Sequence, residues 1–372
     1  MDGLWEVYKR ASLRTQCRDH RTASSTRTNR ISDKIPIPKG EEWTKLLSDI
    51  DSKSALFTCC SEKLLSLFEE KDCAFVSNIG EDTKCSKPEM DLTDLNPYGH
   101  EEADTGMFLR AKHAASHGHR KVLMRTVDSD IIIIAILLFR HLGFEQLWVG
   151  YGKGKYYTDV PIHTICNNLG DFKSQGLAFF QSLMGVDLTS AFRTIGRRTG
   201  RNVWEENPEF DQTFSQIVSD PSLITINSPQ MQQIEKFVAL CFSKKTTEYS
   251  INSARRKLFT VGLKTWDAIP PSLHALFQHV KRACYVTCFQ WKLSLVKYPV
   301  YENPELWGWQ WNERLQQFVP FWTELPDVST GCRMLVGCGC KVACRGRCNC
   351  SSNGQRCSAL CACEGTCMNN DE

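Results

Sequence analysis

The sequence predicts an α/β fold that continues into a helical region and ends in a small cysteine-rich module. Three observations support this prediction. Helix-like and strand-like segments alternate over residues 101–183, helical periodicity dominates residues 206–325, and nine cysteines crowd into residues 338–367. The predicted domains are therefore residues 1–205, 206–325 and 326–372. The composition, 42% hydrophobic and 23% charged, is that of an ordinary globular protein.

The first domain is expected to be a three-layer arrangement of helices and short strands. Apolar spacing predicts a helix within 43–70, and residues 78–99 predict a polar loop. Strands are expected at 122–126 and 146–150, with a hairpin turn at 152–157. Further helices are expected at 101–117, 163–169 and 177–183. The apolar segment 131–139 fits either a buried helix or a buried strand.

The second domain is expected to be helical and to end in a tryptophan-rich connector. Helices are predicted around residues 230–243, 253–268, 272–280 and 282–296. The tryptophans that follow are Trp307, Trp309, Trp311 and Trp322. Core packing is favoured for them over a surface on which nucleic-acid bases stack.

The third domain needs a cross-linker, because the residues between its cysteines are too small and polar to form a core. These cysteines are Cys338, Cys340, Cys344, Cys348, Cys350, Cys357, Cys361, Cys363 and Cys367. The first ten residues contain no apolar signal segment, and no apolar run reaches the ~18 residues that span a bilayer. We therefore expect a reducing compartment, the nucleus or alternatively the cytoplasm, and no membrane partner. Tetrahedral zinc is favoured over disulfides.

The number of thiolates predicts a cluster of about three zinc ions, because tetrahedral ions can share bridging sulfurs. Lys341, Arg345 and Arg347 lie among the cysteines and offset the negative charge of such a cluster. The spacing resembles the CXC domain of the tesmin/TSO1 family. That resemblance implies DNA binding, with these three basic residues as contacts. The alternative is a structural zinc module that contacts other proteins.

Acidic residues at the ends of predicted elements form a second candidate site. Glu102 and Asp104 open a helix, and Asp128 and Asp130 follow a strand. Carboxylates that converge at strand ends repel each other unless a cation such as Mg²⁺ or Mn²⁺ holds them. Helix capping is the alternative explanation for the first pair, since acidic side chains favour helix N-termini.

The segment HEEADTGMFLRAKHAASHGHRKVLMRTVDSDIIIIAI resembles the internal acidic block of PIN-like nucleases of the flap-endonuclease (XPG-type) branch. The resemblance implies that Glu102, Asp104, Asp128 and Asp130 bind Mg²⁺ or Mn²⁺, and that Asp187 in MGVDLTSAF is a further ligand. It also implies backbone contacts to nucleic acid by Arg14, Arg193, Arg197 and Arg198. The family has an earlier strand that ends in a metal-binding aspartate, so this PIN-like domain is expected to be incomplete at its N-terminus.

The whole arrangement also resembles uncharacterised animal proteins associated with mobile elements. The expected function is that of a nuclease-derived protein that binds nucleic acid or chromatin through its zinc module, with a degenerate PIN-like domain. The alternative is a Mg²⁺- or Mn²⁺-dependent, structure-specific endonuclease. DNA is the expected partner and RNA the alternative.

Overall fold

The computed structural model describes residues 1–7, 13, 36, 38–260, 269–325, 338, 349–352, 356–357 and 361–363. The chain divides into two compact units, Met1–Trp322 and Thr323–Glu372. The first is a mixed α/β structure with small sheets, which confirms the predicted class at that level. Within the described part of the chain, no helix is long and apolar enough to cross a membrane.

The first unit begins with a small sheet and two helices. Strand β1 (Asp2–Gly3) pairs in parallel with β2 (Val76–Ile79), and β2 pairs antiparallel with β3 (Asp82–Cys85). The predicted helix at 43–70 is divided into α2 (Glu41–Ser48) and α3 (Ile50–Phe68) at Asp49, whose side chain accepts from the N–H of Ser52 and caps α3. The loop prediction is wrong for β2 and β3.

The polar residues of β2 explain why that strand lacks an apolar signature. Ser77 and Asn78 are buried, which a strand pattern based on apolar residues does not anticipate. The Asn78 side chain accepts from the backbone N–H of Trp5 at 3.0 Å, and Ser77 Oγ lies 2.8 Å from Ser61 Oγ. Buried polar groups are tolerated here because each has a hydrogen-bond partner.

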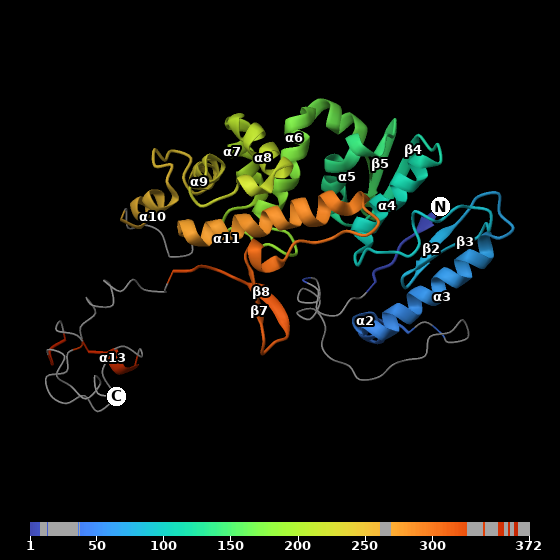
Figure 1. The fold of residues 1–372 in the computed structure, drawn as a ribbon, viewed down its shortest axis with the longest axis horizontal. Helices are drawn as coiled ribbons and strands as arrows, with labels where there is room; N and C mark the ends of the chain where they lie inside the picture. Colours follow the sequence, from blue (N-terminus) through green and yellow to red (C-terminus); the bar gives the residue numbers. More distant parts are fainter. Residues whose placement is uncertain are drawn as a thin grey trace. The chain divides into compact units, whose positions relative to one another are not determined.

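The larger sheet has the order β4-β5-β6. Strand β4 (Lys121–Thr126) is parallel to β5 (Gln146–Tyr151), which pairs antiparallel with β6 (Thr158–Pro161) after a short 3₁₀ turn, η1 (Gly154–Tyr156). Figure 1 shows helix α5 (Ser129–Leu142) in the connection between the two parallel strands, with α4 (Ala103–Ser116) preceding β4. These strands and the hairpin turn confirm the predictions, and the apolar segment 131–139 is a helix.

Two local signals set the helices that frame the sheet. Helix α5 starts at Asp128, whose side chain accepts from the N–H of Asp130 at 2.8 Å, and ends at Gly143, which has φ 71°. Helix α6 (Ile162–Met184) is interrupted at Gly170, which has a φ of 74°. Glycine adopts such a positive φ without a steric penalty. The two predicted helices therefore lie on either side of this kink.

The rest of the first unit is helical and then ends in a hairpin. Its helices are α7 (Arg197–Glu206), α8 (Glu209–Ser219), η2 (Pro221–Leu223), α9 (Pro229–Phe242), α10 (Ile251–Thr260) and α11 (Leu273–Cys284). Helix α11 continues through a π-helical turn, η4 (Tyr285–Trp291), and a 3₁₀ turn, η5 (Lys292–Leu295). The sequence predicted the last four long segments but neither α7 nor α8, and residues 261–268 of the second predicted helix lie outside the described residues.

The core of the helical part is aromatic. Phe214 contacts Phe179, Trp204, Phe210 and Phe237, with ring centroids 5.2–5.9 Å apart. After η6 (Pro304–Trp307), strands β7 (Trp309–Asn312) and β8 (Gln317–Pro320) form an antiparallel hairpin. Trp309 is buried in the core, whereas Trp322 is 56% exposed. The core interpretation of the tryptophans thus holds for Trp309 but not for Trp322.

Candidate metal centres

Four of the five predicted acidic ligands line one depression in the first unit. They are Asp104, Asp128, Asp130 and Asp187. Asp104 lies in the first turn of α4, Asp128 and Asp130 lie at the start of α5 directly after β4, and Asp187 follows α6. The fold therefore brings together residues from three separate parts of the sequence.

The segment that carries Asp187 is held in a tight turn. Gly185 ends α6 with φ 109°, and a Cβ there would lie 2.8 Å from that of Ala191. Thr189 Oγ1 donates to the carbonyl of Ser182 at 2.6 Å and accepts from the N–H of Val186 at 2.9 Å. These contacts fix the backbone on both sides of the exposed Asp187 carboxylate.

Asp130 is partly buried, and its pKa is raised above the ordinary value. Burial is the largest cause, and the negative charges of Asp128 and Asp187 add to it. The side-chain amide of Gln181 donates to Asp130 Oδ1 at 2.9 Å, and this bond opposes the shift, as does the charge of Arg197. Carboxylates that repel each other in this way are stabilised by a bound cation.

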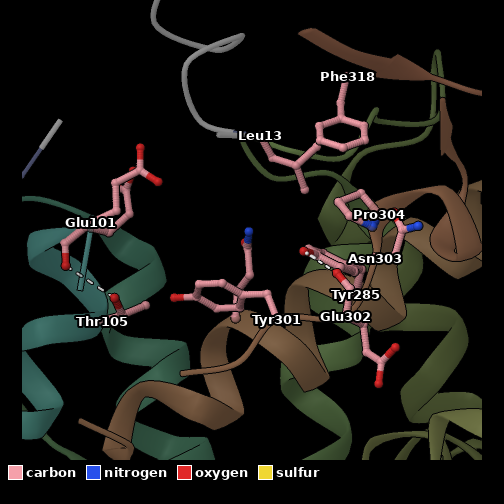
Figure 2. A pocket seen from close by; sticks show the side chains of 11 residues that line it. Leu13, Glu101, Thr105, Tyr285, Tyr301, Glu302, Asn303, Pro304 and Phe318 are labelled. Atoms are coloured by element: carbon pink, nitrogen blue, oxygen red, sulfur yellow. Dashed lines mark hydrogen bonds between the residues drawn. The ribbon is translucent and has the colours of Figure 1, made fainter. Parts of the chain in front are cut away.

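Glu102 lies apart from the four aspartates. It is the N-cap residue of α4, and it lines a neighbouring cavity of about 300 Å³ together with Glu101 and Thr105. Figure 2 shows this cavity, in which Glu101 and Thr105 lie on one side, Tyr285 lies on the other, and Tyr301 lies between them. The role of Glu102 as a metal ligand therefore stays a prediction that rests on its sequence neighbourhood.

Of the predicted phosphate contacts, Arg197 acts on the acidic depression, whereas Arg193 lines a different cavity. Arg193, Arg197 and Arg198 are exposed and follow Asp187 in the chain, with Arg197 and Arg198 opening α7. Arg197 Nη2 also donates to the carbonyl of Gly185. Arg197 therefore supports the turn that carries Asp187, while its charge acts on Asp130. Arg14 lies outside the described residues.

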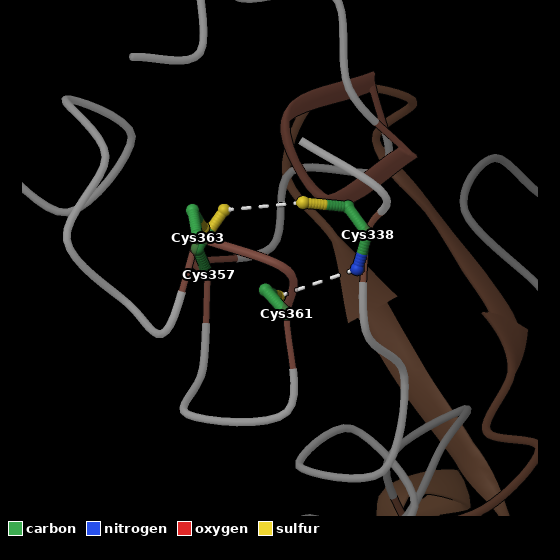
Figure 3. Close-up of side chains that lie close together, drawn as sticks. All are labelled: Cys338, Cys357, Cys361 and Cys363. Carbon is green, nitrogen blue, oxygen red and sulfur yellow. Dashed lines mark hydrogen bonds between the residues drawn. The ribbon is translucent and has the colours of Figure 1, made fainter. Parts of the chain in front are cut away.

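The second unit contains a compact cysteine cluster. The Sγ atoms of Cys338, Cys357, Cys361 and Cys363 all lie within 4.8 Å of one another, and all four residues are buried. Figure 3 shows the four side chains converging, with the N–H of Cys338 donating to Cys361 Sγ at 3.3 Å. A fifth buried cysteine, Cys350, lies 3.6 Å from Cys361 between sulfurs, at the start of the short helix α13 (Asn349–Ser352).

The sulfur–sulfur distances fit a shared metal ion. Four thiolates at about 2.3 Å from a tetrahedral zinc lie about 3.8 Å from each other. The Cys338–Cys357 sulfur distance is 3.7 Å, far longer than the ~2.05 Å of a disulfide. This donor set can hold a metal ion.

The remaining predicted residues of this module cannot be placed. The cysteines Cys340, Cys344, Cys348 and Cys367 and the basic residues Lys341, Arg345 and Arg347 lie outside the described residues. Among the residues that the structure does describe, the cysteine cluster is the only group of three or more metal-ligating side chains that closes on one point. The four aspartates line one depression, but their carboxylate oxygens do not converge as tightly as the four sulfurs do.

Sequence reasoning missed the neighbours of the acidic residues. Gln181, Val286 and Trp291 either bond to Asp130 or line the depression, yet none has a signature in the linear sequence. Val286 and Trp291 belong to the π-helical turn η4, a rare conformation that is frequent at functional sites. Comparisons of the chain with models of protein families, with curated proteins and with solved structures found no match.

Proposed function

We propose that this protein is a nuclease-derived, nucleic-acid-binding protein of the nucleus, with a zinc-ordered CXC-like module as its binding element. The convergence of four buried thiols carries the proposal, because so small a unit needs a metal to fold. Basic residues between the ligands, of which Arg356 is described and exposed, then project from a rigid frame toward phosphates. The nine cysteines of the sequence fit about three zinc ions.

The first unit supports a PIN-like origin. Its parallel β4–β5 pair with a helical crossover directs acidic residues to one place, and exposed arginines follow them in the chain. In this proposal the unit acts mainly as a scaffold and the zinc module selects the nucleic acid, DNA rather than RNA.

The test measures zinc content and DNA binding of the full chain. Metal analysis should return close to three zinc ions per chain. Reversal of three charges, Lys341→Glu/Arg345→Glu/Arg347→Glu, should weaken binding of a labelled DNA duplex at least tenfold and lower the slope of log affinity against log salt by up to about three. The matched control reverses three exposed lysines elsewhere, Lys153→Glu/Lys155→Glu/Lys245→Glu, and should bind more tightly than the first variant. Equal losses in both variants would contradict a role of the module.

A second function, metal-dependent cleavage of phosphodiesters, is favoured by the four aspartates in one depression. Carboxylate oxygens suit Mg²⁺ and Mn²⁺, and repulsion keeps such groups apart until a cation draws them together. Two ions about 4 Å apart can activate water and stabilise the leaving oxygen.

The cleavage test uses Mn²⁺ with flap and single-stranded substrates. Asp128→Ala/Asp130→Ala should abolish cleavage, while Asp82→Ala/Asp94→Ala, which removes two exposed carboxylates elsewhere, should preserve it. Cleavage that survives the first variant would exclude the acidic depression as its source. Absence of cleavage in the wild-type chain, with DNA binding intact, favours the binding function.

A further inference from the structure

A cavity of about 980 Å³ lies along the edge of strand β4 and shares no lining residue with the acidic depression. Five successive residues of this strand, from Lys121 to Arg125, line it. Side chains alternate between the two faces of a strand, so a cavity that touches every residue faces the strand edge. Met1, Asp2 and Val76 from the β1–β2 region line the cavity as well.

The two strand edges that border the cavity are unpaired within the described residues. Strand β4 pairs only with β5, and β1 pairs only with β2. Figure 1 shows β4 in one sheet and β1 with β2 in the other. An open edge presents unpaired backbone N–H and C=O groups, which favour pairing with another strand.

Part of the remaining lining is apolar and comes from one face of α4, and Asp72 and three histidines line the same cavity. Ala103, Met107, Ala111 and Ala114 recur at helical spacing along the cavity. These side chains are mostly small, so a polypeptide backbone can approach the helix closely. Leu123 of β4 is 58% exposed beside the same cavity, an unusual position for a leucine in a sheet strand.

A buried arginine adds a specific polar feature to the cavity. Arg110 of α4 lines it and is 2% exposed. Its Nη2 donates to Thr83 Oγ1 at 3.3 Å, but its Nε and Nη1 are buried without a hydrogen-bond partner. Each open N–H of the charged guanidinium can donate one charge-assisted hydrogen bond to a carboxylate oxygen. Unpaired buried donors are costly, so a ligand that satisfies them gains affinity.

We propose that this groove binds an extended segment of a partner protein, which adds a strand to the edge of β4 and places an acidic side chain against Arg110. Backbone pairing with β4 supplies affinity, and the buried arginine supplies selectivity. The six residues of β4 offer about 20 Å of edge. Lys121 and Arg125, both exposed, also favour an acidic partner.

The test uses a fluorescent eight-residue peptide of alternating threonine and valine, in which glutamate replaces one central valine. The full-length protein should bind it at least fivefold more tightly than the same peptide with glutamine, because only the carboxylate pairs with Arg110 as an ion. Arg110→Gln should remove this preference. Hydrogen exchange at residues 121–126 should slow when the glutamate peptide is bound.

A surface variant keeps the test decisive if Arg110→Gln does not fold. Leu123→Asp should weaken binding of the glutamate peptide at least tenfold by placing a negative charge at the groove. Leu67→Asp, at a helix position that is 57% exposed, should leave binding unchanged. The proposal is overturned by equal affinities for the two peptides, by no binding, or by an unchanged affinity in Leu123→Asp. It is also overturned if a ten-nucleotide thymidine strand occupies the groove and displaces the peptide.

Discussion

The cysteine cluster and the acidic depression offer opposite ligand chemistry and depend on different forces for their geometry. The cluster draws soft sulfur ligands from residues 338–363, a short part of the chain. The depression draws hard oxygen ligands from residues 104–187, and helices, a strand and a tight turn place them. Apolar packing holds the acidic depression in place, whereas the buried cluster that the described residues form at the cysteine site consists of thiols.

This difference predicts opposite responses to the loss of a metal ion. A site built by its ion loses its fold with the ion, because binding free energy is then folding free energy. A site built by a surrounding core keeps its fold and loses only the stabilisation that the ion adds. The following predictions test this contrast, in order of decreasing effect.

The largest effect is expected from disruption of the cysteine cluster. Cys361→Ser should unfold the unit from Thr323 onward, because structural zinc sites contribute on the order of 10 kcal/mol. Hydrogen exchange of the full chain should show complete loss of protection in that unit, and the zinc content should fall. The thermal midpoint of the first unit should stay within a degree of wild type.

The matched variant is Cys73→Ser, which removes an exposed free thiol. It should change neither zinc content nor exchange. If both variants retain wild-type zinc content, the cluster is not the zinc site. If Cys361→Ser lowers the midpoint of the first unit as well, the two units do not fold independently and the contrast between the sites fails.

The next largest effect is expected in the aromatic core. Phe214→Ala removes a fully buried ring at the centre of four aromatic neighbours, so it should lower the free energy of unfolding of the first unit by about 3–5 kcal/mol. Chemical denaturation monitored by tryptophan fluorescence measures this change. Phe172→Ala, where the ring is 63% exposed, should cost far less. A loss of zinc in Phe214→Ala would contradict the separate origins of the two sites.

The contrast also explains how much of each site the sequence predicts. Cys338, Cys357, Cys361 and Cys363 were assigned from spacing alone, because ligands close in sequence are close in space. Asp128 and Asp130 were likewise found as neighbours after a strand. Their proximity to Asp187 was expected from a family resemblance, and no spacing rule gives it. Gln181 was missed because its partner, Asp130, is distant in the sequence.

The fold itself was predicted where apolar periodicity is strong and missed where polar groups are buried. Helix α5 and strands β4 and β5 have dense apolar patterns and were expected. Strand β2 was taken for loop because its buried Ser77 and Asn78 are polar and hydrogen-bond to Ser61 and to the backbone of Trp5. Helix α7 was missed because its basic first turn predicted a phosphate-facing or solvated segment. Tertiary contacts decide such segments, and a single sequence does not display them.

A moderate, pH-dependent effect is expected at His279, which braces the acidic site. Its Nε2 donates to the Leu183 carbonyl at 2.8 Å, and burial lowers its pKa to about 4, with the charge of Arg282 adding to the shift. Since an unfolded histidine has a pKa near 6.5, the unfolded chain binds more protons between pH 6.5 and 4. The first unit should therefore lose about 2 kcal/mol of stability between pH 7 and 5 through this group.

His279→Gln removes the titrating ring and retains a side-chain donor. Denaturation midpoints measured at several pH values should show a shallower decline for this variant than for wild type. His274→Gln, at the first turn of the same helix, serves as the control and should follow the wild-type profile. Identical profiles in all three proteins would show that His279 does not stay neutral in the folded state.

The smallest effect on the metal-free protein is expected at Asp130, and the direction of this effect distinguishes the two sites. The pKa of Asp130 is raised, so its charged form is disfavoured in the folded protein at neutral pH. Asp130→Asn should therefore increase the stability of the metal-free protein, by up to about 1 kcal/mol, and abolish the gain of about 2.7 kcal/mol expected with Mn²⁺ at a hundredfold excess over its Kd. Asp94→Asn, at an exposed carboxylate, should change neither quantity. Thermal denaturation with and without Mn²⁺ measures both. If Asp130→Asn is instead less stable than wild type, the fold needs this carboxylate, as the cysteine module needs its thiolates. The contrast between a site held by packing and a site held by its metal ion would then be contradicted.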